Sequence, residues 1–488
     1  MNIISPKKKQ TNATKILALV KGFEVFNDPS GTAWIGLPSS NGYSEYVPLR
    51  SGRFSGWVAR RFLETYGATV GQKAIDDARA VLSGIAADVV KQVYVRVANL
   101  GDVVFIDLGN RYVEITVGGW QFTDKPPVPF RRPAGMLPLP EPAIQYEGRL
   151  EDTLGEVLGM SGSDLLLIVA WTIGTYNTCD YPILVLNGEQ GSGKSTISEI
   201  LKSLIDPAEV TLRAVPRDEQ GLAVAANNSW LVALDNLSSV PDWLSDALCR
   251  ISTGAGYSAR RLYFDLDEVF AKTQRPVILN GIPELATRGD LQDRSIVITL
   301  SGITDIQRRS KENIMNRFQE LLPVMLGQVF DAIRAALALK GRMTIPNLPR
   351  MADFALWAAG GITTATYSSV QDFVNVYESN RQDAVLALLD VSPLGQELQE
   401  FAAKQRRWTG TTTDLRDKLI LQALGTPTEQ TLQKMTVKAL NNELRRLAPV
   451  LRRVGVSIEF QGLKKVSGVV GRFIEIADLS TLQGVKVP

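Results

Sequence analysis

Four short runs of apolar residues recur along the middle of the chain, each bounded by polar or turn-forming residues. They cover residues 181–186, 230–234, 276–279 and 295–300. Unbroken apolar runs of this length are typical of strands that are buried on both faces of a parallel sheet. Helical patterns alternate with them at residues 163–175, 195–204 and 242–251. The alternation predicts an α/β core in which helices flank a parallel sheet.

The chain before this core has a mixed pattern. Strand-like runs at 93–97 and 103–107 accompany helical patterns at 56–66 and 72–87, which predicts an α+β domain over residues 1–125. Prolines are dense in residues 126–142, where neither a helix nor an inner strand accommodates them, so we expect a stiff linker there.

Three further units are expected after the linker. They are the sheet-containing core at 143–303, a helical unit at 304–390 and a C-terminal module at 391–488, in which short helices precede a β pair.

Composition excludes several classes of chemistry. The 488 residues include no histidine, so Ser-His-Asp and Cys-His nucleophile systems and His-ligated zinc are excluded. Cys179 and Cys249 lie far apart in sequence and are expected to be free, buried thiols. The longest apolar stretch, residues 165–173, is too short to cross a membrane, and no signal-peptide pattern is found. We therefore expect a cytoplasmic protein without a membrane partner.

A phosphate-binding motif directly follows the run at 181–186. It consists of Gly188, Glu189, Gln190, Gly191, Ser192, Gly193, Lys194, Ser195 and Thr196, which matches G-x-x-x-x-G-K-[ST]. The glycines let backbone N–H groups surround a β-phosphate at the N-terminus of the next helix. Lys194 is expected to reach the β- and γ-phosphates of ATP, and Ser195 to hold Mg²⁺. The alternative is a glycine-rich turn that merely contains Lys-Ser, but the flanking strand and helix favour nucleotide binding.

Two other apolar runs end in polar residues that suit the same site, because ligands of open α/β sheets bind at the carboxyl ends of the strands. Asp235 is a candidate Mg²⁺ partner, or else a helix cap. Asn236 stands where many P-loop ATPases carry a glutamate, and an amide can also orient the attacking water. Asn280 is placed to bond the γ-phosphate or that water, or else forms an Asn-Gly turn.

Two arginines precede the last apolar run. An arginine at this position, beyond the phosphate site of its own chain, is placed to act as an arginine finger on a neighbouring subunit. Arg294 is the first candidate and Arg288 the second. Either could instead form a surface salt bridge with Asp290 or Asp293.

The order of these motifs resembles that of the AAA+ ATPases, and more closely that of superfamily 3 and minichromosome-maintenance-type replicative helicases. The resemblance covers roughly residue 150 to the C-terminus. The phrases Leu234-Asp-Asn-Leu, Ser258-Ala-Arg-Arg-Leu-Tyr-Phe-Asp, Arg275-Pro-Val-Ile-Leu-Asn-Gly and Pro349-Arg350-Met-Ala-Asp-Phe are similar to those of self-loading helicases from prophages and bacterial mobile elements. The usual Asp-Glu pair of the family is Asp-Asn here.

This resemblance implies a P-loop AAA+ ATPase core with a helical lid, assembled as a hexameric ring with ATP and Mg²⁺ at the subunit interfaces. It also implies that Arg350 is the lid arginine that contacts the γ-phosphate in cis or in trans, unless it is a solvated helix-start residue. Residues 256–274 correspond to a hairpin in the ring channel. Its tip, at 265–268, is acidic, so DNA contacts are expected from the arms, or these cations are intersubunit partners. The arm cations are Arg260, Arg261, Lys272 and Arg275.

The C-terminal module resembles a winged helix, with helix-like segments at 394–404, 411–424 and 437–453 before the β pair. Residues 393–488 hold 15 Lys and Arg against 9 Asp and Glu. Such a balance fits binding to DNA phosphates, while protein docking is the alternative. The candidate DNA contacts are Lys438, Arg445, Arg446, Lys464 and Lys465.

The resemblance thus implies an ATP-dependent DNA helicase or translocase that unwinds DNA for replication of a mobile element or phage. Single-stranded DNA is expected in the channel and duplex at the fork, with a primase or other replication protein as a possible partner. The alternative is a nucleotide-switched DNA-binding initiator or defence ATPase without processive unwinding. Asn236 supports this alternative, because slow hydrolysis suits a switch.

Overall fold

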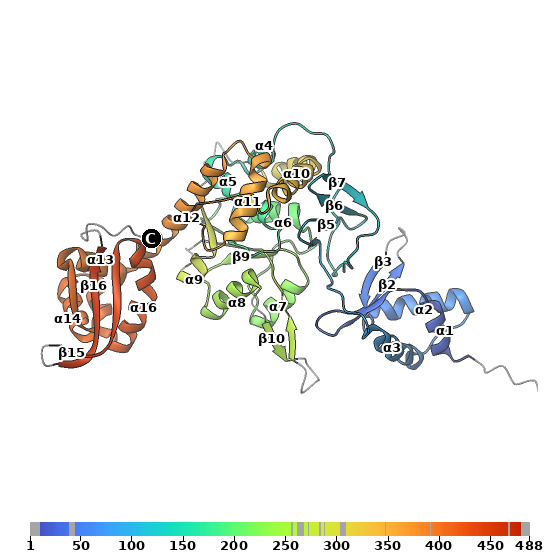
Figure 1. Cartoon of the computed structure of the whole chain (residues 1–488), viewed down its shortest axis with the longest axis horizontal. Coiled ribbons are helices and arrows are strands. Elements are labelled where there is room, and N and C mark those ends of the chain that lie inside the picture. The colour runs from blue at the N-terminus through green and yellow to red at the C-terminus, as the bar shows by residue number, and fades with distance from the viewer. Residues whose placement is uncertain are drawn as a thin grey trace, which may run out of the picture.

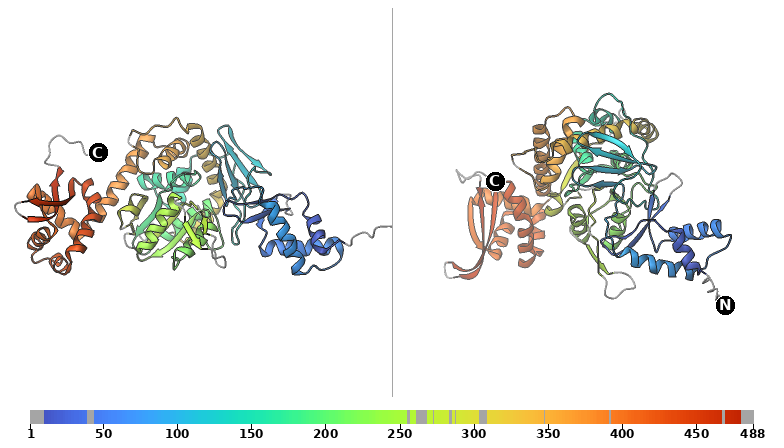
Figure 2. Two further views of the ribbon diagram at one scale, coloured as in Figure 1. Left: turned by 60° about the horizontal axis from the view of Figure 1, so that its bottom comes forward. Right: turned by 45° about the vertical axis from the view of Figure 1, so that its right-hand side comes forward.

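The computed structural model describes residues 10–38, 44–254, 257–260, 268–271, 273–282, 285–286, 288–302, 309–346, 348–390, 392–466 and 469–479. Within these ranges the chain forms an N-terminal unit, a central unit and a C-terminal module, which lie in a row in the views of Figures 1 and 2. The N-terminal unit and the C-terminal module each have a hydrophobic core of their own.

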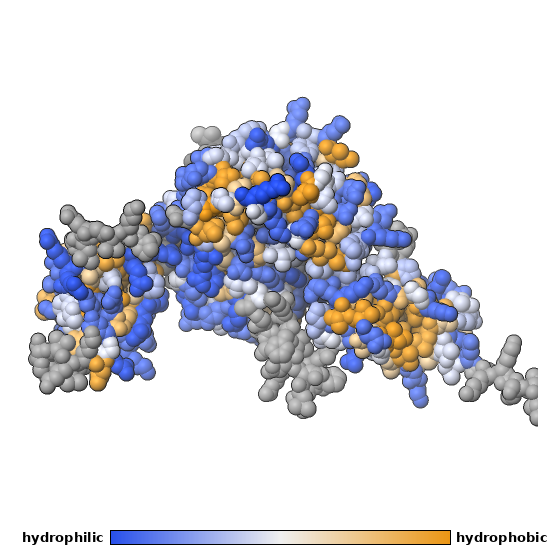
Figure 3. All heavy atoms as spheres, in the orientation of Figure 1, coloured by the Kyte–Doolittle hydropathy of each residue, from blue (hydrophilic) through white to orange (hydrophobic). Residues whose placement is uncertain are grey.

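The N-terminal unit packs three helices on an antiparallel sheet. The helices are α1 (Asn12–Leu19), α2 (Gly52–Tyr66) and α3 (Gln72–Ala86), and the strands are β1 (Val25–Asn27), β2 (Ala33–Pro38) and β3 (Ser44–Pro48). Apolar side chains also gather on the outer surface of this unit (Figure 3). Exposed examples on α2 and α3 are Leu63, Tyr66, Val81 and Ile85.

A second antiparallel sheet belongs to the central unit. Its strands are β4 (Val97–Asn99), β5 (Val104–Asp107), β6 (Tyr112–Thr116) and β7 (Gly119–Thr123). Val97, Ile106 and Ile115 lie in the same hydrophobic core as the helices of the central unit. The region expected to be one α+β domain at 1–125 is therefore divided between two cores. The proline-rich segment after it is fastened to the central unit, since Leu137 N–H donates to Pro207 O (3.0 Å) and Ala143 N–H to Pro323 O (2.8 Å).

The central sheet is parallel, as predicted. Its strands are β8 (Ile183–Gly188), β9 (Val232–Leu237), β12 (Val277–Gly281) and β13 (Ser295–Leu300), in the order β13-β8-β12-β9. Side chains alternate between the two faces: Leu184 and Leu186 enter one core, while Ile183 and Val185 enter the other. Both faces are covered, which explains why the strands read as unbroken apolar runs.

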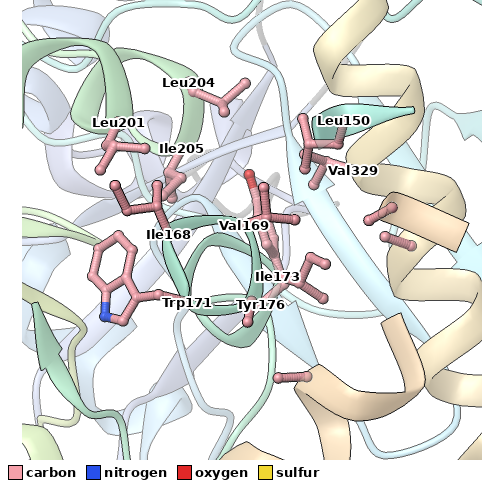
Figure 4. Close-up of a cluster of buried hydrophobic side chains, with 14 of the residues drawn as sticks. Leu150, Ile168, Val169, Trp171, Ile173, Tyr176, Leu201, Leu204, Ile205 and Val329 are labelled. Carbon is pink, nitrogen blue, oxygen red and sulfur yellow. The ribbon is translucent and has the colours of Figure 1, made fainter. Parts of the chain in front are cut away.

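Helices cover both faces of this sheet. On one side are α4 (Leu150–Leu158), α5 (Gly162–Gly174), α6 (Lys194–Ile205), α10 (Lys311–Leu339), α11 (Ala352–Ala365) and part of α12 (Val370–Asp390). Figure 4 shows Ile168, Trp171, Leu201 and Leu204 of this core. On the other side are α7 (Glu219–Asn227) and α8 (Asp242–Thr253), next to the short α9 (Gly289–Gln292). The expected α/β architecture, a parallel sheet flanked by helices, is confirmed.

Helix α10 is the one helix in the described residues that is long and apolar enough to cross a membrane by itself, and α4 with α5 pass the same test as a pair bent by 115°. Of the apolar segment of α10 that could cross a membrane, 67% is buried inside the protein. This helix packs against α11 and α4. The helices expected to form a lid at 304–390 thus share the central core. Their apolar surface explains this, since Phe354, Trp357 and Ile362 of α11 are all buried.

The C-terminal module combines helices with a three-stranded sheet. Its elements are α13 (Pro393–Gln405), β14 (Arg407–Thr411), α14 (Thr412–Gln422), α15 (Pro427–Lys434), α16 (Val437–Arg453), β15 (Val456–Val466) and β16 (Val469–Asp478). The antiparallel sheet has the order β14-β16-β15, so the first strand pairs with the last.

The expected hairpin between β9 and β12 is present in its described part. Strands β10 (Tyr257–Arg260) and β11 (Glu268–Ala271) pair antiparallel, with Arg260 opposite Glu268. Arg261, Lys272 and most of the expected acidic tip lie outside the described residues.

Candidate nucleotide site

The loop between β8 and α6 depends on its glycines. A Cβ on Gly188 would lie 2.5 Å from the carbonyl oxygen of Leu300 on the neighbouring strand β13. Gly193 caps α6 with φ +88°, a left-handed conformation that glycine adopts without strain. The loop therefore passes close to the sheet and leads directly into the N-terminus of α6.

Lys194, the first residue of α6, is folded back over this loop. Its ammonium donates to the carbonyl oxygens of Gly188 (2.8 Å) and Glu189 (2.6 Å), and to Ser192 Oγ (3.3 Å). Burial lowers the pKa of Lys194, and the nearby carboxylate of Asp235 opposes that shift. Two carbonyl oxygens and one hydroxyl of the loop thus hold the ammonium group.

Ser195 and Asp235 are in direct contact across the end of the sheet. Ser195 Oγ donates to Asp235 Oδ1 at 2.9 Å. A hydroxyl and a carboxylate side by side suit Mg²⁺, which usually takes one or two protein oxygens and completes its shell with phosphates and water. The described residues contain no cluster of three or more acidic or thiol ligands, so a metal bound only by protein side chains does not fit them.

Asn236 and Asn280 are joined by a hydrogen bond. Asn236 has φ +57°, and its N–H donates to Asn280 Oδ1 at 2.9 Å. The side chain of Asn280 is buried, and its Nδ2 donates to Ser198 Oγ on α6 at 2.9 Å. Asn280 therefore links the turn after Asp235 to the helix of the phosphate loop, whereas the exposed Asn236 faces outward. A direct contact between Asn280 and phosphate remains a prediction.

A cavity of about 800 Å³ opens beside the phosphate loop and is lined by residues 191–197. The apolar part of its lining also includes Val157, Leu158, Met160, Ile200, Leu300 and Ile314. Arg309, also in the lining, holds the turn between α4 and α5 by donating to Glu156 O (3.0 Å) and Val157 O (2.8 Å). No local sequence pattern identifies these residues, because they come from separate segments and each has the pattern of an ordinary core or surface residue.

A second cavity, of about 480 Å³, borders Asp235 and Asn236. Arg213 lies in its wall, on a segment that continues the sheet beyond β9. Asp235 N–H donates to Arg213 O (2.9 Å), and Arg213 N–H to Ala233 O (3.0 Å). Both cavities therefore lie at the carboxyl ends of the strands, where the motifs predicted the site.

The two candidate finger arginines lie at the opposite end of the sheet. Arg294 directly precedes β13, whose register places Ser295 opposite Ile183 and Leu300 opposite Gly188. At a rise of about 3.3 Å per residue, Arg294 starts roughly 20 Å from the phosphate loop of its own chain. Its Nη1 donates to Asp290 O at 2.8 Å.

Arg288 and Arg350 form ion pairs at the same end of the sheet. Arg288 contacts the carboxylates of Asp246 (3.0 Å), Asp242 (3.4 Å) and Asp290 (3.4 Å), so within one chain the expected salt-bridge alternative is observed. Arg350 lies 3.5 Å from Asp293. Their roles at a neighbouring active site stay predictions.

The expected DNA-binding cations of the C-terminal module fall into two groups. Lys438 and Arg445 are exposed on α16, and the Arg445 guanidinium lies 4.1 Å from the centre of the Phe460 ring. Arg446 instead pairs with Glu443 (2.8 Å) and lines a groove that also includes Gly289 of the central unit. Lys464 and Lys465 belong to β15, and their side chains lie outside the described set.

Arg275 was expected as an arm cation available to DNA, but it is instead buried and bonded to the backbone of the core. Its Nε donates to Ser229 O (2.8 Å) and Ala226 O (3.0 Å), and burial lowers the pKa of Arg275 to about 10. The two cysteines, Cys179 and Cys249, are free and buried, as expected. Burial raises the pKa of Cys249 to about 11, so its reactive thiolate is rare at neutral pH.

Comparison with solved structures gives two examples of similar chains. The first is titled the A form apo structure of the NrS-1 C-terminal region. It has 16% identity and a TM-score of 0.41, over 96% of this chain and 99% of that one. The second is titled SCCmec type IV Cch, active helicase. It has 14% identity and a TM-score of 0.42, over 94% of this chain and 93% of that one. The chain matches no curated protein sequence significantly.

Two family models match the chain in succession. Residues 156–383 match the actinomycete integrative conjugative element replication protein, and residues 394–484 match the AICE RepA C-terminal domain. The first match contains the phosphate loop and both asparagines, and the second contains nearly all of the module built around α16. The expected resemblance is thus confirmed: over these residues the chain matches the family of replication proteins carried by integrative conjugative elements of actinomycetes.

Proposed function

We propose that this chain is an ATP-dependent DNA helicase or translocase, with a P-loop AAA+ core, that assembles as a ring and unwinds DNA during replication of a mobile element. The observation that carries the proposal is the hydrogen bond between Ser195 and Asp235. Ser195 and Lys194 also line the cavity of about 800 Å³. The match to a replication protein family supports DNA as the substrate.

In this proposal the chain binds ATP with Mg²⁺. Lys194 exchanges its three loop acceptors for β- and γ-phosphate oxygens, and Ser195 with Asp235 holds the ion. The apolar part of the cavity lining, which includes Met160 and Ile314, receives the adenine ring. Bound Mg²⁺ neutralises charge that develops on the phosphates during transfer.

Asn236 is proposed to orient the attacking water. Its exposed side chain is placed by the left-handed backbone and by the bond from its N–H to Asn280. Because an amide cannot take up a proton as a carboxylate does, its contribution is positioning. The same feature supports the second candidate function, a nucleotide-switched DNA-binding initiator or defence ATPase without processive unwinding.

A ring of six copies is proposed because the arginines lie far from the phosphate loop of their own chain. In such a ring, Arg294 or Arg288 of one subunit stabilises the phosphate charge at the site of the next. The strand order of the C-terminal module and its cations on α16 support a winged helix that contacts duplex DNA. Single-stranded DNA in the channel, a primase partner and a cytoplasmic location are part of the same proposal.

Strand displacement on a forked DNA duplex tests this function. Wild-type protein is expected to separate the strands with ATP and not with a non-hydrolysable analogue. The Lys194→Ala variant is expected to lose ATP turnover by at least about a thousandfold, because phosphate charge loses its cation. It should keep the unfolding temperature of the wild type, since the ammonium contacts only loop oxygens.

The control is Lys434→Ala, which removes an exposed lysine of α15 and should unwind like the wild type. Unwinding by Lys194→Ala at the wild-type rate would overturn the motor. DNA binding that responds to the analogue as strongly as to ATP, without strand separation, would favour the switch instead.

A further inference from the structure

Asp293, between α9 and β13, is shared by three arginines from three other elements. Arg453, the last residue of α16, makes the shortest contact, in which its Nη2 donates to Asp293 Oδ1. Arg350 lies 3.5 Å from the other carboxylate oxygen, and Arg381 of α12 lies 3.9 Å from Oδ1. One negative charge therefore faces three guanidinium groups.

Two of these arginines are fixed to the central unit. Arg350 lies two residues before the start of α11, whose apolar face is buried in the central core. Arg381 lies one residue after Asn380, which holds α12 to β13 through Val297 N–H (3.1 Å) and Val297 O (2.5 Å). Arg453 alone arrives with the C-terminal module, so its distance from Asp293 reports where that module lies.

The ion pair is part of a wider contact between α16 and α9. An added Cβ on Gly289 of α9 would lie 3.8 Å from Val450 of α16. Glu443, Arg446 and Val450 line a groove of about 350 Å³ that reaches Gly289. This face of α16 is turned toward the central unit. Lys438 and Arg445, seven residues apart and so on one face of the helix, remain exposed.

Of the three arginines, Arg453 makes a hydrogen bond to Asp293, and the other two are close to it as ion pairs. At 3.5 and 3.9 Å, Arg350 and Arg381 are attracted to Asp293 but donate no hydrogen bond to it. The Nε atoms of Arg381 and of nearby Arg294 are buried without a hydrogen-bond partner. These guanidinium groups therefore keep donors that a phosphate, with its fork of acceptor oxygens, would satisfy.

We propose that Asp293 is a switchable counter-ion that links the position of the C-terminal module to ATP hydrolysis. With the module docked, Arg453 occupies Asp293 and leaves Arg350 and Arg381 to the phosphates of a neighbouring subunit's nucleotide. When the module leaves, Asp293 closes on these two arginines and withdraws them. The inference rests on the proposed function, since it assumes that arginines of this edge serve a second copy of the chain.

Steady-state ATP hydrolysis by the full chain tests the switch. The Arg453→Ala substitution should lower kcat about tenfold or more, because Asp293 then holds Arg350 and Arg381 away from the nucleotide. The affinity for a fluorescent ATP analogue should stay within about twofold of the wild-type value. Adding Asp293→Asn to Arg453→Ala should restore most of the lost kcat, since no carboxylate remains to hold the arginines. A purely structural role for Arg453 predicts no such rescue.

The matched control is Arg407→Ala, which removes an exposed arginine paired with Glu475 inside the C-terminal module. It should keep the wild-type kcat. A wild-type kcat for Arg453→Ala, or a double variant as slow as Arg453→Ala, would overturn the switch while leaving the proposed function intact. A wild-type chain that binds ATP without turning it over would overturn both.

Discussion

The two ends of the central sheet hold their polar residues in different ways. At the carboxyl end, Ser195 bonds Asp235 and Asn236 bonds Asn280, each at 2.9 Å, so the groups are fixed by one another. At the amino end, Arg288 and Arg350 form ion pairs with aspartates of their own chain. The first arrangement is prepared for a ligand, whereas the second can exchange its partners.

Backbone geometry accounts for this contrast. The carboxyl ends of parallel strands lie side by side at one edge of the sheet, so short side chains there contact one another directly. At the other edge, long arginine side chains reach carboxylates that are partly exposed, and such pairs contribute little stability and rearrange readily. Under the proposed function, one chain supplies the phosphate-binding half of each site and offers its arginines to another chain.

The largest test of this contrast is Arg294→Ala. If Arg294 serves a neighbouring subunit, its loss should lower ATP turnover by about a hundredfold to a thousandfold, because the transferred phosphate loses a stabilising charge. Mixing Arg294→Ala with Lys194→Ala subunits should then restore part of the activity, at interfaces that combine one intact loop with one intact arginine. Turnover is measured across a series of mixing ratios.

Each variant alone at the same total concentration is the control for this mixture. A mixture no more active than the sum of its parts would place Arg294 in a role within its own chain. The contrast between the two ends of the sheet would then lose its functional meaning.

Asn280→Ala tests the carboxyl end with a smaller expected effect. Removing the amide frees the N–H of Asn236 and the hydroxyl of Ser198, so Asn236 should orient water less well. We expect kcat to fall about tenfold to a hundredfold with KM for ATP nearly unchanged. Asn280→Asp, which keeps the acceptor for Asn236, should recover part of kcat. An equal loss in both variants would indicate a direct contact between the amide donor and phosphate.

Much of the carboxyl end could be predicted from the sequence, because its information is local. The loop around Lys194 is a contiguous motif, and Asp235 and Asn280 each end a recognisable apolar run. The apolar part of the cavity lining could not be predicted, since Met160 and Ile314 have the pattern of ordinary core residues and come together only in the fold. The pairing of Arg453 with Asp293 depends on how a whole module docks, which no local pattern encodes.

The fold shows the same division. Unbroken apolar runs predicted the four parallel strands, because burial on both faces leaves a pattern in each strand. The sharing of β4–β7 with the central core was missed, since an apolar strand pattern indicates that side chains are buried but not against which neighbour. The expected lid helices were likewise placed in a separate unit, although α11 is apolar on nearly every side.

The smallest expected effect on catalysis, and a clear one on stability, concerns a buried brace at the end of α6 that is farthest from the phosphate loop. Asp206, just after α6, accepts hydrogen bonds from Lys202 (2.6 Å), Arg96 (3.2 Å), Trp230 N–H (2.8 Å) and Leu231 N–H (3.2 Å). Burial disfavours the charged carboxylate, but Lys202 and Arg96 outweigh it and lower the pKa of Asp206 to about 2. The carboxylate thus ties the end of α6 to the start of β9.

Because this pKa is depressed in the folded chain, the stabilisation is fully present above the ordinary value of about 4 and is lost as the pH falls from about 4 to about 2. At pH 7, Asp206→Asn should lower the free energy of unfolding by about 3 kcal/mol, since Lys202 and Arg96 stay buried without their counter-charge. Urea unfolding of the variant should also depend less on pH through that acidic window. Glu400→Gln, which breaks an exposed pair with Lys404, is the control and should leave the transition in place. Equal shifts in the two variants would mean that this buried brace is no firmer than an exposed ion pair.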